Sequence, residues 1–209
     1  YKIKYLPFFL LSMLPFKILY ILADFLYVLM YYVVGYRKRV VRSNLQKAFP
    51  ELNVSERISI ERKFYKHFCD VIVESVKFIT ISRNNLKHRF KILNPDLIDR
   101  FGSENKSYLL YSGHIGNWEW FPAIPLYSEV KIIGLYLPLR STYFNHLIIN
   151  IRQRFGMELI EAIRAYKALL NYAAANVDTF TIFIADQSPH KGADKHWSQL
   201  FKLDTPFNT

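Results

Sequence analysis

The sequence predicts an α/β fold with a mixed, largely parallel sheet flanked by helices, preceded by an N-terminal membrane helix. Two observations support this fold class. From residue 108 onward, short runs of β-branched and aromatic residues alternate with longer helix-compatible segments, and this alternation is typical of parallel strands joined by helices. Before that point the chain is first continuously apolar and then helical in its spacing, so its N-terminal part is predicted to lie outside the sheet.

The first 36 residues are predicted to form a membrane anchor. The stretch 18–34 is apolar apart from Asp24 and, at about 1.5 Å per residue, is at the lower end of what spans a bilayer as a helix. Apolar residues before it lengthen the region, with a kink expected at Pro15. An interfacial helix or a half-inserted hairpin stays open as the alternative, because Pro15, Lys17 and Asp24 interrupt the apolar run.

The basic charge is concentrated in the first half of the chain. Residues 1–100 carry 18 Lys and Arg against 8 Asp and Glu, whereas residues 101–209 carry 10 against 9. The basic cluster at 37–42 directly follows the apolar stretch, which predicts that the domain 37–209 is cytoplasmic. A basic surplus beside an apolar helix indicates an anionic membrane as partner, and no nucleic acid is expected.

Residues 37–100 are predicted to be helical. The segment 40–49 fits a helix that ends before a proline. Asn53 and Glu56 then have the spacing of a capping box, which predicts the start of a long helix. Apolar residues recur at three- and four-residue spacing as far as Ile79, with basic residues between them. We interpret most of these charges as the solvated face of a helix that packs on a core.

Residues 101–209 are predicted to form the α/β part. The expected strands and helices are strands at 108–112, 131–136, 158–161 and 179–185, and helices at 118–127, 142–155 and 163–176. Sites in such folds lie at the carboxyl ends of the strands. His114 follows one of these ends and Asp186 follows another, so we expect the two residues to face the same crevice.

The stretch 107–120, SYLLYSGHIGNWEW, places an imidazole and a carboxylate at a strand-to-helix turn. On one helix, His114 and Glu119 would lie roughly 140° apart, so His114 must lie in the turn, where Gly113 and Gly116 permit a sharp bend. A carboxylate beside an imidazole fixes its tautomer and stabilises its protonated form. The pair therefore predicts a general base, and a loop histidine beside a capping glutamate is the structural alternative.

The same stretch resembles a known family. SGHIGNWEW resembles the His-x4-Asp/Glu motif of the lysophospholipid acyltransferase superfamily, in the form found in the bacterial lipid A biosynthesis acyltransferases. Three further segments are similar to that family: YRKRVVRSNLQKAFPE at 36–51, IRQRFG at 151–156 and ADQSP at 185–189. The resemblance implies a glycerolipid acyltransferase-like fold. It also implies further strands and helices beyond Thr209, so we expect the chain to be a fragment.

The resemblance also implies roles for individual residues. His114 and Glu119 match the catalytic pair, with Glu119 expected to orient the ring. Four residues are implied or chosen as substrate-binding candidates: Arg152, Asp186, Gly116 and Asn117. The last two are candidates because backbone amides at a helix start can bind an oxyanion. One departure concerns the Tyr-Arg-Pro segment of the family, where this chain has Leu137 before the proline and Arg140 is a candidate replacement.

The implied activity is transfer of a fatty acyl group from an acyl-carrier-protein thioester to a hydroxyl of a lipid A precursor. The site is expected at the cytoplasmic face of the cell inner membrane. No cofactor is expected, and the donor is acyl carrier protein or coenzyme A. No metal is expected, since Cys69 is the single cysteine and His190, Asp194 and His196 fit a solvated loop better than a metal site. The alternatives are an acyltransferase for another polar lipid and a non-catalytic, basic membrane-binding protein.

Overall fold

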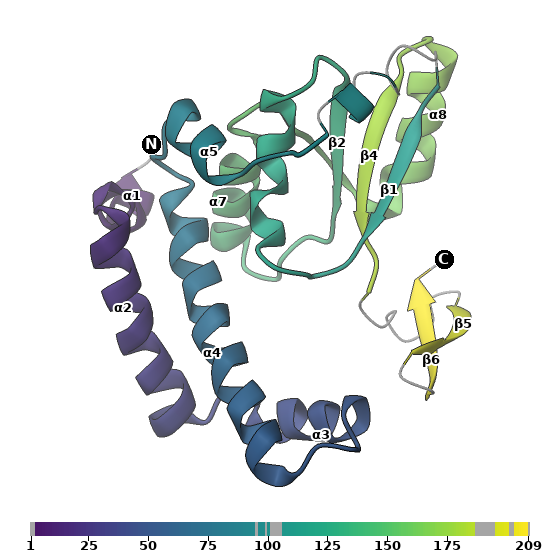
Figure 1. Ribbon diagram of the computed structural model, residues 1–209. Helices are drawn as coiled ribbons and strands as arrows, with labels where there is room; N and C mark the ends of the chain where they lie inside the picture. Colours follow the sequence, from purple (N-terminus) through teal and green to yellow (C-terminus); the bar gives the residue numbers. More distant parts are fainter. Residues whose placement is uncertain are drawn as a thin grey trace. The chain divides into compact units, whose positions relative to one another are not determined.

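The computed structural model describes residues 3–94, 96–98, 100, 106–186, 195–200 and 203–208. The chain divides into two compact units. The first comprises Tyr1–Thr80 and Ser198–Thr205, and the second comprises Ile81–Trp197 and Pro206–Thr209. Figure 1 shows the helices of the first unit in purple to blue and the sheet of the second in teal to green.

The first unit is built from helices. These are the short 3-10 helix η1 (Ile3–Tyr5), α1 (Leu6–Met13), α2 (Phe16–Val28), the π-helical segment η2 (Leu29–Val34), α3 (Lys38–Ala48) and α4 (Val54–Lys77). The chain breaks between α1 and α2 at Pro15, as expected for a residue without a backbone N–H. Helix α4 begins with the predicted capping box. The Asn53 side chain accepts a hydrogen bond from the Glu56 backbone N–H, and the Glu56 side chain accepts one from the Asn53 backbone N–H.

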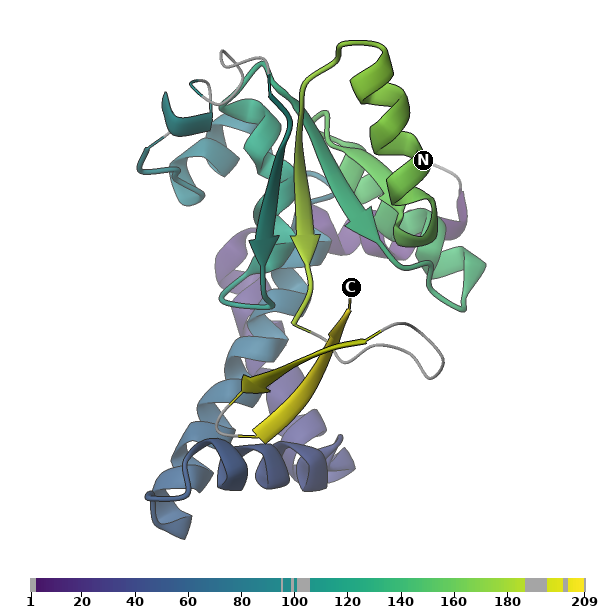
Figure 2. The same ribbon diagram turned by 90° about the vertical axis from the view of Figure 1, so that its right-hand side faces the viewer.

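The second unit contains a four-stranded, fully parallel sheet. Its strands are β1 (Tyr108–Ser112), β2 (Lys131–Tyr136), β3 (Glu158–Glu161) and β4 (Thr179–Ile184), in the spatial order β1-β4-β2-β3. Figure 2 shows strands of this sheet running in the same direction. The sequence prediction of a largely parallel sheet is confirmed, and all four expected strands form within one residue of their predicted bounds.

The connections in this unit are helical. They are α5 (Arg83–Arg89), the 3-10 helix η3 (Trp118–Leu126), α7 (Thr142–Gln153), the 3-10 helix η4 (Ala162–Arg164) and α8 (Ala165–Ala174). Element η3 was expected as an ordinary helix, but Pro122 and Pro125 lie inside it and prevent regular α-helical hydrogen bonds. The core of the unit combines buried residues from the sheet with residues of η3, including Ile124, Ile132, Phe180 and Ile182.

Two strands near the C-terminus form a separate sheet. β5 (Lys195–Leu200) pairs with β6 (Leu203–Asn208). His196 therefore lies in a strand, which corrects the expectation that it belongs to a polar loop. The other two residues considered with it, His190 and Asp194, lie outside the described residues. Among the residues that the structure describes, no group of three or more His, Cys, Asp or Glu side chains could hold a metal ion.

Candidate active site

The register of two neighbouring strands creates the candidate site. β1 and β4 are adjacent and parallel, and the last pair in their register is Ser112 with Ile184. His114 and Asp186 each follow two residues later, on the same edge of the sheet. Because parallel strands end together, the chain brings these two side chains side by side although they are 72 residues apart in sequence. The expected meeting of His114 and Asp186 is thus found.

Asp186 contacts both the ring and the backbone of His114. Its Oδ1 lies 2.5 Å from the ring Nδ1, and its Oδ2 accepts a hydrogen bond of 2.7 Å from the His114 backbone N–H. The side chains of His114 and Asp186 are 29% and 41% exposed, so the pair remains within reach of a substrate. The Trp118 ring stands edge-on to the imidazole, with 4.9 Å between ring centroids. The imidazole is therefore restrained by both the carboxylate and the indole.

The Asp186 carboxylate at Nδ1 determines the tautomer of the neutral His114 ring. Partial burial of Asp186 acts to raise its pKa, but hydrogen bonds from the His114 ring and backbone outweigh this and lower the pKa of the carboxyl group. The carboxyl group is therefore ionised at neutral pH and accepts the Nδ1 proton. In the neutral imidazole, the lone pair is then carried by Nε2. This is the tautomer that a general base needs.

Gly113 is required for the close approach of Asp186. A Cβ atom at position 113 would lie 3.0 Å from the Asp186 Oδ2 and 3.3 Å from its Cγ, which is tighter than ordinary van der Waals contact. Two residues beyond His114, Gly116 has a φ of +58°, and an L side chain rarely adopts that conformation. Both glycines thus shape the turn, as the sequence predicted. His114 lies in this turn, outside the following helix.

Glu119 and Arg152 form a second, separate pair. Glu119 lies in the first turn of η3 and Arg152 in the last turn of α7. The Arg152 Nη2 donates to both carboxylate oxygens at 2.7 and 3.0 Å, and its Nε donates to Oε2 at 3.1 Å. The side chains are 18% and 26% exposed. This planar, two-pronged contact fixes the orientation of both groups.

The pairing corrects the role expected for Glu119. From the sequence, Glu119 was expected to orient the His114 ring and Asp186 was expected to be a substrate-binding residue. In the structure, the carboxylate at the ring Nδ1 is that of Asp186, and the Glu119 carboxylate binds Arg152. The physical reason is that pairing follows strand register across the sheet, whereas the short sequence spacing of Glu119 places it on the helix that faces α7.

The two backbone candidates lie in the sequence between His114 and Glu119. Gly116 is in the turn after His114, and Asn117 precedes the first residue of η3. Their amide groups are close in sequence to His114. Leu137 and Arg140, at the point of departure from the family pattern, lie in the segment between β2 and α7 and are exposed.

A hollow in the second unit lies away from the two pairs. It has a volume of about 840 Å³ and is lined by residues that include Lys87, Tyr127, Lys131 and Asp178. Lys131 is the first residue of β2 and Asp178 directly precedes β4. The hollow is therefore at the amino ends of the strands, the edge opposite His114. It does not belong to the candidate site.

Comparison with known proteins adds a family to this geometry. A family described as bacterial lipid A biosynthesis acyltransferase has a model that matches residues 5–193 of the chain. The matched range includes most of both units and all four residues of the two pairs. No match was found among curated proteins.

Proposed function

Because the chain belongs to the bacterial lipid A biosynthesis acyltransferase family, we propose that it moves a fatty acyl group from a thioester to a hydroxyl of a lipid A precursor. Acyl transfer itself is the activity of the family. The observation that carries the finer proposal is the contact between Asp186 and the ring Nδ1 of His114. Because Nδ1 is bound by Asp186, we propose that Nε2 is the ring nitrogen that acts as the base. The imidazole lies at the carboxyl edge of the sheet.

The proposed reaction is a direct transfer. Nε2 of His114 removes the proton of the acceptor hydroxyl as its oxygen attacks the thioester carbonyl carbon. A new C–O bond forms, and the carbonyl oxygen becomes an oxyanion. When the carbonyl reforms, the C–S bond breaks and the thiolate takes the proton from His114. Asp186 stabilises the imidazolium between these two steps, as a buried or half-buried carboxylate does for other histidine bases.

The second pair is proposed to build the substrate-facing wall. Glu119 uses Nε and Nη2 of Arg152, and the remaining terminal nitrogen, Nη1, is the donor that we propose for a phosphate of the acceptor. Backbone N–H groups of Gly116 and Asn117 are proposed to bind the oxyanion. Glu119 acts here as a positioning residue, because it holds the guanidinium.

The proposed partners follow from the same chemistry. The acyl donor is acyl carrier protein or coenzyme A, both of which present the acyl group as a thioester, and the reaction requires no cofactor. Members of the family are typically membrane-associated, and the part of the chain that the structure describes contains one helix that is long and apolar enough to cross a membrane by length and composition. We propose that the reaction takes place at the cytoplasmic face of the inner membrane.

A histidine substitution tests the mechanism. His114→Ala in the full chain is expected to reduce acyl transfer by roughly 10² to 10⁴, measured by mass spectrometry of the acceptor lipid with acyl carrier protein or coenzyme A thioesters. His88→Ala is the matched control, because His88 is exposed on α5 of the same unit and should leave the rate unchanged. Full transfer by the His114→Ala protein would refute the mechanism. Offering other polar lipids in the same assay distinguishes the acceptors.

A further inference from the structure

The N-terminal apolar helix exposes only one side. In the segment Phe16–Val34, which comprises α2 and η2, 17% of the most apolar stretch of 18 residues is buried. The buried side contains Leu19, Ala23 and Tyr31. The opposite side carries the large exposed apolar residues Ile18, Ile21, Leu22, Phe25, Val28, Leu29, Tyr32, Val33 and Val34. A helix that is apolar on one exposed side and packed on the other differs from an isolated membrane span, which is surrounded by lipid.

Helix α4 covers the packed side. Figure 1 shows α2 and α4 running side by side. Leu19 and Ala23 of α2 share one buried cluster with Cys69 and Val73 of α4. The Cys69 Sγ lies 3.9 Å from the Sδ of Met30, one turn before the end of η2. The apolar contact therefore extends over most of the length of the apolar segment.

Polar contacts run along the same interface. Near the start of the apolar segment, Lys77 donates to the backbone carbonyls of Ser12 and Leu14 at 2.9 Å. Further along, the Tyr20 hydroxyl donates to Glu74 at 2.7 Å, and Lys66 lies 3.3 Å from Asp24. As the residue number rises along α2, the number of its partner on α4 falls, so α2 and α4 form an antiparallel hairpin. Asp24, the single acid of the apolar segment, faces α4 and pairs there.

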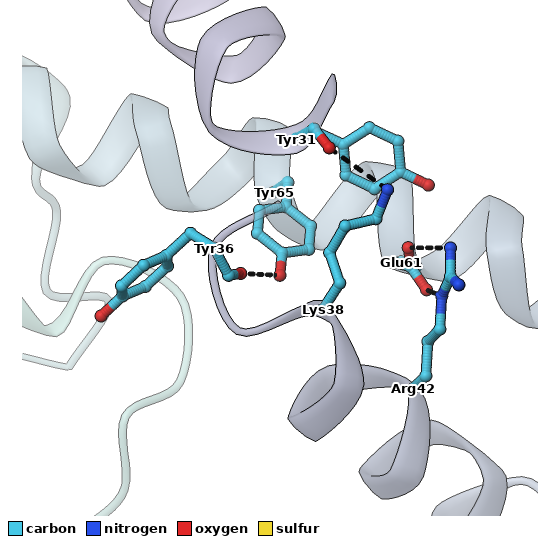
Figure 3. Close-up of polar contacts among 6 residues, drawn as sticks. All are labelled: Tyr31, Tyr36, Lys38, Arg42, Glu61 and Tyr65. Atoms are coloured by element: carbon cyan, nitrogen blue, oxygen red, sulfur yellow. Dashed lines mark hydrogen bonds and ion pairs between the residues drawn. The ribbon is translucent and has the colours of Figure 1, made fainter. Parts of the chain in front are cut away.

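At the far end of the hairpin lie several partly buried polar contacts, which Figure 3 shows. The Tyr65 hydroxyl donates to the Tyr36 carbonyl. Arg42 of α3 donates to both oxygens of Glu61, at 2.9 and 3.3 Å, and the Glu61 side chain is 1% exposed. Lys38 Nζ donates to the Tyr31 carbonyl at 3.2 Å and lies 3.8 Å from the centre of the Tyr31 ring.

Helix α4 is too charged to enter the hydrocarbon beside α2. Between positions 61 and 77 it carries Glu61, Arg62, Lys63, Lys66, Asp70, Glu74 and Lys77. A charged residue at the centre of a membrane helix is strongly unfavourable. If α2 crossed the bilayer alone, it would have to leave α4, which would separate Asp24 from Lys66 and lose the buried cluster around Cys69. If both crossed, the charges of α4 would be buried in lipid.

We propose that the α2–α4 hairpin lies along the membrane surface and enters one leaflet only. The exposed apolar side of α2 and η2 inserts among the acyl chains, while α3 and α4 stay at the headgroups. The partner is an anionic lipid leaflet, because these two helices carry exposed cations beside the apolar segment: Arg39, Arg42, Lys47, Arg62, Lys63 and Lys66. This inference concerns the mode of membrane attachment and goes beyond the acyl transfer proposed above.

The first test asks on which side of the membrane the two ends lie. Lys4→Cys and Arg39→Cys are introduced separately into the full chain with Cys69→Ala, and each protein is treated with a membrane-impermeant maleimide. Spheroplasts expose the periplasmic face, and inverted inner-membrane vesicles expose the cytoplasmic face. The proposal expects both cysteines to react in the same preparation. Reaction of the two cysteines from opposite faces would show that the helix crosses the membrane and would overturn the proposal.

The second test asks whether the hairpin persists in the membrane. Met30→Cys is expected to form a disulfide with the native Cys69 in membrane-bound protein, whereas Leu29→Cys, on the exposed side, is the matched control and should not. Oxidation is carried out at alkaline pH, because burial raises the pKa of the Cys69 thiol to about 11. Ala23→Cys, in the same buried cluster as Cys69, replaces Met30→Cys if that variant has a lowered melting temperature.

The outcomes are distinguishable from those of the enzymatic proposal. Neither test measures acyl transfer, so an inactive but correctly attached protein supports this inference and refutes only the mechanism. Loss of the Met30→Cys and Ala23→Cys crosslinks in membranes, with crosslinks retained in detergent, would show that α2 leaves α4 on insertion. That result would overturn the proposal even if both ends react from one face.

Discussion

The two units use the same kind of ion pair for different purposes. In the helical unit, Glu61 is 1% exposed and is bound by Arg42 of the preceding helix. In the α/β unit, the pairs of His114 with Asp186 and of Arg152 with Glu119 are between 18% and 41% exposed. A carboxylate that water and substrate cannot reach serves packing, whereas one at the end of a strand remains available for chemistry. The exposure of the carboxylate, more than its pairing, separates the structural pair from the two pairs of the proposed active site.

The largest effect is expected from Asp186→Asn. The amide keeps the shape of the carboxylate but cannot stabilise the imidazolium, so the turnover number should fall by roughly 10² to 10⁴, measured with saturating acyl donor. Asp178→Asn is the control, because Asp178 lies directly before the same strand at the opposite edge of the sheet. An unchanged turnover number in Asp186→Asn would assign this carboxylate to packing, like Glu61.

A smaller loss of activity is expected from Gly113→Ala. The new methyl group would lie 3.0 Å from Asp186 Oδ2 and should displace the carboxylate, which reduces the turnover number by up to about 10². A double-mutant cycle provides the control: in the Asp186→Asn background the same substitution should have a weaker effect, because the contact that it disturbs has already changed. Additive losses would show that Gly113 acts through some other contact.

For the structural pair, Arg42→Ala should affect stability and leave chemistry unchanged. It leaves Glu61 buried without this cation, but Arg42 itself is 56% exposed, so water reduces the loss to about 1 to 3 kcal/mol. Thermal unfolding in detergent measures the change, and acyl transfer below the melting temperature should stay near that of the unsubstituted chain. A loss of activity without destabilisation would mean that the two units do not divide their roles in this way.

The smallest effect concerns acid pH. The pKa of Asp186 is lowered from its ordinary value of 3.8, so the folded state favours the ionised carboxyl group. Its contribution to stability should be fully present above pH 3.8 and lost as the pH falls through the lowered pKa. The melting temperatures of the unsubstituted chain and of Asp186→Asn should therefore converge as the pH falls through the lowered pKa of Asp186. A difference that grows in acid would contradict the direction of the shift.

Sequence reasoning located the elements better than the pairings. The turn at His114 could be predicted because it depends on neighbours: the spacing to Glu119 excludes a shared helical face, and Gly113 and Gly116 permit the bend. The partner of the ring could not be chosen in this way, because Asp186 reaches His114 through the strand order β1-β4, in which β4 lies next to β1 and not next to β3. That order depends on long-range packing.

The N-terminal region shows the same limit. Hydropathy identifies the apolar stretch 18–34 but is silent about what covers it. The capping residues Asn53 and Glu56 predicted where α4 begins, yet nothing in its spacing indicated that Lys66 and Glu74 would meet polar groups of the apolar helix. Local rules predict where helices begin and end, whereas the choice of neighbour is decided by how two complete surfaces fit.

Gly113 has a consequence for how related sequences can diverge. Because Gly113 has no side chain, the Asp186 carboxylate can lie close against its backbone. A substitution at either position therefore affects which residues are tolerated at the other. A lineage that acquired a side chain at position 113 would be under pressure to move its acid to another strand, and one that lost the acid would be free to fill the turn. The glycine and the aspartate, 73 positions apart in the chain, should therefore co-vary among related sequences.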